Sequence, residues 1–160
     1  MRVLLDANVL LDCLVLEASG LPRAGKAASD QVLTLCDTGV HHGLVAWHTL
    51  PIVAYYHARQ HNAQDTAAMM DTLLAMLEVP TVTHRDAQNW RSHGITDFED
   101  ALQFASAVAG VADGLITRNT ADFAGSAIPV MTPEEFLAAN PLTPEDGDED
   151  ADATAGRTDS

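Results

Sequence analysis

The chain has 160 residues, of which 47% are hydrophobic, and these values are typical of a single globular domain. No apolar run approaches the roughly 20 residues that cross a bilayer, and an acid at position 6 interrupts the first apolar run, so we predict neither a membrane span nor a signal peptide and expect a cytoplasmic protein. The net charge of −15 argues against a general nucleic-acid-binding surface, because phosphate recognition normally requires basic residues.

Strand and helix patterns alternate in the first half of the chain. Residues 2–6 (RVLLD) form the short apolar run of a buried strand, and the pattern of 7–16 predicts a helix. A second helix is predicted at 29–39, where Gly39 is suited to end it. Residues 43–47 predict the second strand, and Thr49 is placed to cap the helix that follows it.

The same alternation continues to the end of the domain. We predict helices at 65–77, 84–94, 98–109 and 133–139, and strands at 79–82, 113–119 and 128–132. Strands that alternate with helices indicate a parallel sheet covered on both faces. The predicted fold class is therefore α/β, with three layers in the order α/β/α around a central parallel sheet.

Part of the acidic charge lies in the last twenty residues. Residues 141–160 carry seven acids and one arginine, and no large apolar residue follows Leu142. Such a segment cannot bury enough apolar surface to fold. We therefore predict a domain at 1–140 and a disordered acidic tail at 141–160. Of the net charge of −15, the tail accounts for −6 and the domain for −9.

Acidic and polar residues stand where the predicted strands end. Asp6 follows the first strand, and Asn119 and Asp122 follow the fourth. Asp97 and Asp100 open the helix that leads into that fourth strand, and their spacing of one turn places them on the same side. Because ligands of open α/β folds bind beyond the carboxyl ends of the strands, we expect these side chains to converge.

A convergent set of carboxylates predicts a divalent cation. Hard oxygen ligands select Mg²⁺ or Mn²⁺, and such an ion activates water and neutralises phosphoryl charge during phosphodiester hydrolysis. Helix capping is the alternative interpretation. Thr96 and Glu99 have the spacing of a capping box, and Asp97 is itself a good N-cap residue. In either case, Glu99 is expected to point away from the site.

Three motifs in this order resemble the PIN domain: DANVLLD at 6–12, DFEDALQFASA at 97–107 and DGLITRNTADF at 113–123, followed by IPVMTPEEFL at 128–137. The resemblance covers about residues 1–140 and is strongest for bacterial members related to the VapC-type toxins of toxin–antitoxin pairs. It implies a PIN-like fold and a metal-dependent endoribonuclease that uses Mg²⁺ or Mn²⁺. It also implies an RNA substrate, a cognate antitoxin protein and a homodimer.

The resemblance assigns roles residue by residue. Asp6 matches the metal ligand after the first strand, and Asn8 matches the small polar residue beside it. Asp100 matches the acid that opens the late helix, with Asp97 as a nearby helper. The resemblance thus implies a metal site formed by Asp6, Asp100, Asp97 and Asp122, and a catalytic set of Asp6, Asp100, Asp97, Thr117 and Asn119.

Two departures from the family pattern concern charge. Many PIN nucleases carry a glutamate in the helix after the second strand, but residues 46–56 (AWHTLPIVAYY) contain no acid. The nearest polar groups are His48 and Thr49. Asn119 stands where many members have an aspartate. The sequence therefore leaves two hypotheses open: an active endoribonuclease that is the toxin of a toxin–antitoxin pair, or a catalytically degenerate PIN fold that binds protein or RNA.

Three further interpretations stay open. Arg118 is predicted beside the site, either binding phosphate or solvated, and His48 is either a structural histidine or a contact to RNA. An aspartyl-phosphate phosphatase is the weakest option, because the DAN sequence at 6–8 lacks the second acid of the DxDxT motif.

Overall fold

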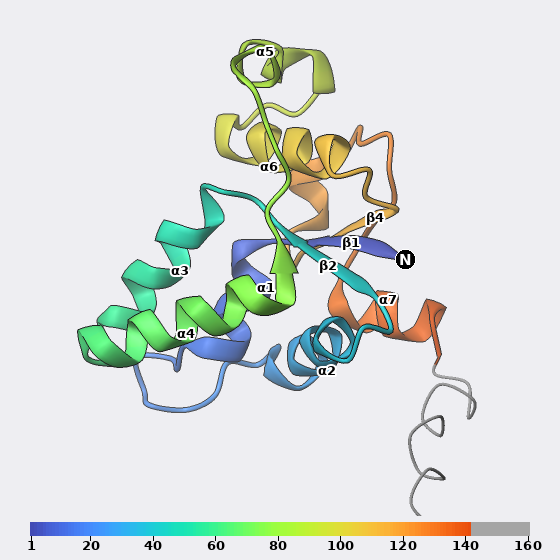
Figure 1. The fold of residues 1–160 in the computed structure, drawn as a ribbon. Helices are drawn as coiled ribbons and strands as arrows, with labels where there is room; N and C mark the ends of the chain where they lie inside the picture. Colours follow the sequence, from blue (N-terminus) through green and yellow to red (C-terminus); the bar gives the residue numbers. More distant parts are fainter. Residues whose placement is uncertain (142–160) are drawn as a thin grey trace, which may run out of the picture.

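The computed structural model describes residues 1–141 and has three layers (Figure 1). The predicted acidic tail lies, from residue 142 onward, outside the described residues. The sheet has five strands, all parallel, in the order β3-β2-β1-β4-β5. The strands are β1 (Arg2–Leu5), β2 (His42–Val45), β3 (Leu77–Glu78), β4 (Gly114–Ile116) and β5 (Val130–Met131). The predicted α/β class and parallel sheet are confirmed.

Seven α-helices in the described residues cover the two faces of the sheet. α1, α2, α3, α4 and α7 lie on one side, and α6, with α5 beyond it, lies on the other (Figure 1). Their bounds are α1 (Ala7–Leu14), α2 (Lys26–Asp37), α3 (Thr49–Ala58), α4 (Ala63–Met76), α5 (His84–Gln88), α6 (Phe98–Ala109) and α7 (Pro133–Ala139), with 3₁₀ turns η1 (Trp90–His93) and η2 (Thr120–Phe123). No helix among residues 1–141 has both the length and the apolar character needed to cross a membrane.

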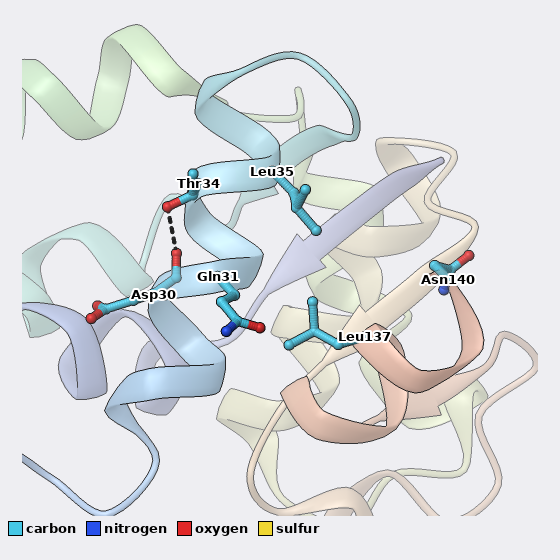
Figure 2. Close-up of a pocket in the computed structure, with 6 residues that line it drawn as sticks. All are labelled: Asp30, Gln31, Thr34, Leu35, Leu137 and Asn140. Carbon is cyan, nitrogen blue, oxygen red and sulfur yellow. Dashed lines mark hydrogen bonds between the residues drawn. The ribbon is translucent and has the colours of Figure 1, made fainter. Parts of the chain in front are cut away.

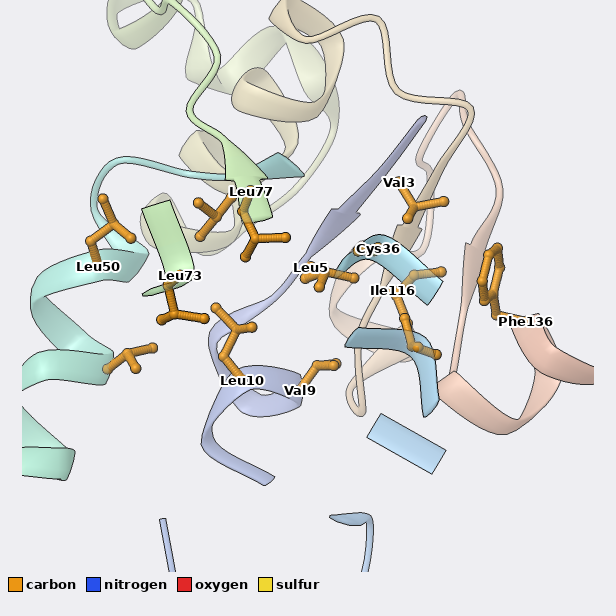
Figure 3. Close-up of a cluster of buried hydrophobic side chains, with 13 residues drawn as sticks. Val3, Leu5, Val9, Leu10, Cys36, Leu50, Leu73, Leu77, Ile116 and Phe136 are labelled. Atoms are coloured by element: carbon orange, nitrogen blue, oxygen red, sulfur yellow. The ribbon is translucent and has the colours of Figure 1, made fainter. Parts of the chain in front are cut away.

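The apolar core forms two clusters because side chains alternate along the central strands. Val3 and Leu5 point to the α1 side, where they join a cluster that includes Leu10 and Phe136 (Figure 3). Leu4, between them, joins the cluster beneath α6. Since β1 is buried on both faces, its uninterrupted apolar run is what a central parallel strand requires. This burial fixes Asp6 at the carboxyl edge of the sheet.

Several predicted boundaries differ from the structure by a few residues, and three differences have a clear physical cause or consequence. The third strand is Leu77–Glu78 rather than 79–82, because it follows α4 directly and Pro80 next to it has no N–H to donate to a strand partner. The helix predicted at 84–94 divides into α5 and η1. Thr49 lies inside the first turn of α3, and His48 takes the cap position.

Candidate metal centre

Asp6 is buried and firmly held. Its side chain is 8% exposed, at the junction of β1 and α1. One carboxylate oxygen, Oδ1, accepts a hydrogen bond from the backbone N–H of Ala7 at 2.5 Å. The other, Oδ2, accepts from the Thr117 hydroxyl and from the Asn8 amide, both at 2.6 Å. These donors set the direction of the carboxylate before any ligand binds.

Thr117 joins the ends of the two central strands. It is fully buried directly after β4, and its hydroxyl oxygen accepts from the Asn8 amide and from the backbone N–H of Asn119, each at 3.0 Å. The Asn8 side-chain oxygen in turn accepts from the backbone N–H of Arg118 at 3.0 Å. β1 and β4 are adjacent, and the chain order of the strands changes direction between them, which is where α/β folds bind ligands.

Gln103 is a member of this network that the sequence analysis missed. It is 1% exposed on α6, and its amide nitrogen lies 3.4 Å from Asp6 Oδ1. Its side-chain oxygen accepts from the Thr49 hydroxyl at 3.0 Å, which explains why Thr49 does not cap α3. The available signal was a glutamine on a mainly apolar helix face, because a buried amide requires polar partners.

Three carboxylates cluster at the start of α6. Asp97 is the N-cap of this helix and accepts from the backbone N–H groups of Glu99 and Asp100 at 2.8 and 3.2 Å. These three side chains each offer an oxygen within 4.8 Å of the others. The expectation that Glu99 points away was wrong, since Glu99 Oε1 also lies 3.4 Å from His48 Nε2. Capping and clustering therefore coexist, and the cap is Asp97 rather than a Thr96–Glu99 capping box.

Electrostatic repulsion links this cluster to the rest of the predicted site. The pKa of Asp100 is raised to about 6, first by burial and then by the charges of Glu99, Asp97, Asp122 and Asp6. The pKa of Asp6 is also raised, mainly by burial, with Glu99 adding to the effect. The other three predicted metal ligands, Asp6, Asp97 and Asp122, are thus close enough to Asp100 for their charges to raise its pKa. Asn119 follows β4 there with an exposed side chain.

The donor set fits a small hard cation. Two oxygens bound to one Mg²⁺ ion at about 2.0–2.1 Å lie at most roughly 4.2 Å apart, so small side-chain rotations would bring the clustered oxygens into range. Among residues 1–141, no lysine or arginine forms an ion pair with Asp6, Asp97, Glu99 or Asp100. A divalent ion would supply the missing positive charge. The carboxylates suit Mg²⁺ or Mn²⁺.

Arg118 has a structural role that matches neither interpretation from the sequence. Its guanidinium donates to Asp12 at 2.8 Å, to Glu134 at 2.6 Å and to the carbonyl oxygen of Gly25 at 2.5 Å. Asp12 is only 4% exposed and also accepts from Arg23 at 2.9 Å. The arginine therefore ties β4 to α1, α2 and α7 and is not available for phosphate.

We expect Asp12→Asn to lower the free energy of unfolding by about 2 kcal/mol, because two arginines lose a buried anionic partner while Glu134 still pairs with one of them. Urea denaturation would measure the change. The matched control is Asp30→Asn, which breaks the partly exposed pair with Lys26 and should cost under about 1 kcal/mol. Equal effects of the two variants would contradict the structural role assigned to Asp12.

A cavity of about 370 Å³ lies elsewhere, between α2 and α7 (Figure 2). Leu35 and Leu137 supply apolar walls, and Asp30, Gln31, Thr34 and Asn140 complete the lining. None of the predicted site residues lines it. The acidic cluster and this cavity are therefore separate features.

Comparison with known proteins identifies the family. The model of the PIN domain matches residues 2–121. No protein of curated function matches the sequence significantly.

Solved structures share the fold. A chain of VapBC2 from Rickettsia felis, crystallised with a DNA fragment from the promoter, is 15% identical with a TM-score of 0.59, and the match covers 82% of this chain and 97% of that one. FitAcB from Neisseria gonorrhoeae is 19% identical, with a TM-score of 0.58 and coverage of 82% and 98%. VapBC-1 from nontypeable Haemophilus influenzae is 15% identical, with a TM-score of 0.59 and coverage of 84% and 99%. At these identities the likeness concerns the fold.

Proposed function

The chain belongs to the PIN-domain family, and from this premise we propose that it is a metal-dependent endoribonuclease, the toxin of a toxin–antitoxin pair. One observation carries the proposal. The pKa of Asp100 is raised to about 6, first by burial and then by the negative charges of Glu99, Asp97 and Asp122 and of Asp6 at the end of β1. Such an arrangement destabilises the protein unless a cation binds, so its presence is best explained by metal-dependent chemistry.

In this proposal Asp6 and Asp100 hold Mg²⁺ or Mn²⁺, with Asp97 and Asp122 binding the ion or orienting its waters. When bound there, such an ion would lower the pKa of a coordinated water and neutralise charge on the phosphoryl oxygens. Thr117 is buried and holds the Asp6 carboxylate, whereas the exposed Asn119 positions the attacking water or the scissile phosphate. The hydrogen bonds from Asn8 and Ala7 keep the Asp6 carboxylate aimed at the site.

Glu99 compensates for the acid that α3 lacks. The family pattern has a glutamate in the helix after the second strand, whereas the first turn of α3 here offers Thr49 and its cap is His48. Glu99 reaches from α6 to within 3.4 Å of His48, so it brings a carboxylate to this side of the site. We therefore assign Glu99 to the acidic centre as well.

The remaining parts of the proposal rest on the family and on the solved structures. Those structures are of VapBC and FitAB, which supports a cognate antitoxin as partner. We propose residues 1–140 as the nuclease domain, a homodimer as the toxin's own assembly and the cytoplasm as its place of action. We also keep the proposal, made from the composition alone, that residues 141–160 form a disordered acidic tail.

A second candidate function is a PIN fold that binds RNA or protein without cleaving it. The neutral Asn119 and the absence of an acid in α3 favour it, because both reduce the charge available to a cation.

Metal binding and cleavage separate the two candidates. We expect the purified full chain to bind Mn²⁺ with measurable heat in calorimetry and to cleave a 5′-labelled single-stranded RNA with Mg²⁺ or Mn²⁺ but not with EDTA. The variant Asp6→Asn/Asp100→Asn should give no binding heat, whereas Asp71→Asn, at an exposed acid on α4, should behave like the wild type. A wild type with neither heat nor cleavage would favour the binding module.

A further inference from the structure

A second cavity lies next to the acidic centre. It has a volume of about 200 Å³ and lies between the start of α3, the start of α5 and one side of α6. Its walls are mainly apolar, with Val82, Leu102 and Ala105 among them, and Trp47 and His48 form the wall at the end of β2. The volume suits one flat heterocyclic ring and is too small for a folded element of another protein.

His48 is shared by this cavity and the acidic centre. Its ring lines the cavity, and its Nε2 lies 3.4 Å from Glu99 Oε1. The Nε2 atom is buried but has no hydrogen bond of acceptable geometry within residues 1–141. A ligand in the cavity would therefore lie one side chain away from the carboxylates that the proposed reaction uses.

Trp47 offers a stacking surface at the mouth of the cavity. It is 69% exposed, which is unusual for the largest side chain in a protein with few aromatic residues. Trp47 directly precedes His48 at the carboxyl edge of the sheet. Because its side chain is largely exposed, core packing does not explain why a tryptophan stands at this position. Aromatic side chains in such positions stack the unpaired bases of single-stranded RNA.

One basic residue, Arg85, belongs to α5, the helix that supplies Asp86 and Ala87 to the lining of the cavity. Among residues 1–141, the lysines and arginines without a carboxylate within ion-pair distance are Arg59, Arg85 and Arg91. Arg91 belongs to η1, where it lies over the Trp90 ring at 4.3 Å, and Asp86 on α5 places a carboxylate in the lining itself. An arginine of α5 without a carboxylate partner is suited to pair with a phosphate of a strand bound at the cavity.

We propose that this cavity binds an unstacked base of single-stranded RNA, on the strand that passes the acidic centre, with Trp47 as its stacking partner. The proposal rests on the proposed ribonuclease function and adds a base-binding subsite, formed by Trp47 and His48, beside the acidic centre. Duplex RNA cannot occupy the cavity, because its bases remain stacked within the helix.

Fluorescence of Trp47 tests the proposal directly. The chain has two tryptophans, so Trp90→Phe leaves Trp47 as the only reporter, and adding Asp100→Asn prevents cleavage. We expect a five-nucleotide single-stranded RNA, with Mg²⁺ present, to quench this fluorescence. The same oligonucleotide with abasic residues, and its duplex form, should bind about tenfold more weakly or not at all. Equal quenching by the abasic strand, or no quenching by any strand, would overturn the proposal.

Cleavage assays with matched variants distinguish this inference from the proposed function. Trp47→Ala should raise the dissociation constant for single-stranded RNA about tenfold, and Trp47→Phe should restore most of the affinity because it keeps an aromatic face. Tyr55→Ala, at an aromatic residue 58% exposed on α3, is the control and should leave affinity unchanged. If the wild type cleaves RNA while Trp47→Ala binds and cleaves like it, only the cavity inference fails. Base-dependent quenching in a protein that cleaves nothing would leave the inference standing and refute the ribonuclease.

Discussion

Asp100→Asn is expected to abolish RNA cleavage and, at the same time, to stabilise the metal-free protein. The loss of cleavage, by at least about 100-fold, follows from removing one of the two carboxylates proposed to hold the ion. The gain in stability follows first from the partial burial of the Asp100 charge and then from the repulsion that Glu99, Asp97, Asp122 and Asp6 exert on it. Because Asp100 is partly exposed, solvent screening limits the gain to roughly 1 kcal/mol.

The pH dependence of that gain has a defined sign. The folded protein raises the pKa of Asp100 from 3.8 to about 6, so between these values the native state binds more protons than the unfolded state. Wild-type stability contributed by this residue therefore falls as pH rises from about 4 to 6. The difference between Asp100→Asn and wild type should be near zero below pH 4 and reach its full size above pH 6.

Melting temperatures with and without Mg²⁺ complete the test. Wild type should gain stability when Mg²⁺ is added, because the ion binds only the native state, and Asp100→Asn should gain much less. Asp71→Asn also removes one negative charge, but from an exposed position on α4, and should match the wild type both without Mg²⁺ and in its gain of stability with Mg²⁺. An Asp100→Asn protein that still cleaves RNA at the wild-type rate would remove Asp100 from the mechanism.

Asp6→Asn should also abolish cleavage, but it should destabilise the metal-free protein by about 1–2 kcal/mol. Both carboxylate oxygens accept hydrogen bonds, from Ala7 on one side and from Thr117 and Asn8 on the other. An amide can accept on only one side, and its NH₂ group would then face another buried donor. Removing the buried charge of Asp6 is favourable, because burial raises the pKa of this carboxyl group. The lost hydrogen bonds outweigh that gain.

The contrast between the two variants is the informative result. Urea denaturation without metal at neutral pH should place Asp6→Asn below wild type and Asp100→Asn above it. The two substitutions are chemically identical, so neither the lost charge nor the new amide alone explains opposite signs. If Asp6→Asn proved as stable as Asp100→Asn, the hydrogen-bonded position of Asp6 described above would be wrong.

The local pattern of the sequence predicted most of the fold. The helices at 98–109 and 133–139 match α6 and α7, and the run at 2–6 matches β1 with Asp6 directly after it. α6 is long, β1 is strongly apolar and α7 opens with Thr132 and Pro133, and all of these signals are local properties of the sequence. β3 has only two residues, which is too short to produce a period, and its position was therefore missed.

The sequence by itself determined the alternating strands and helices, the parallel sheet and the acids at its carboxyl edge, because burial of each element is recorded in its own residues. Only the tertiary structure decided which side chains meet there. In the folded protein Glu99 lies next to His48, Gln103 lies beside Asp6, and Arg118 pairs with Asp12. These partners lie up to 106 positions apart in the chain. Such contacts depend on how helices pack across the sheet, and no local pattern encodes that packing.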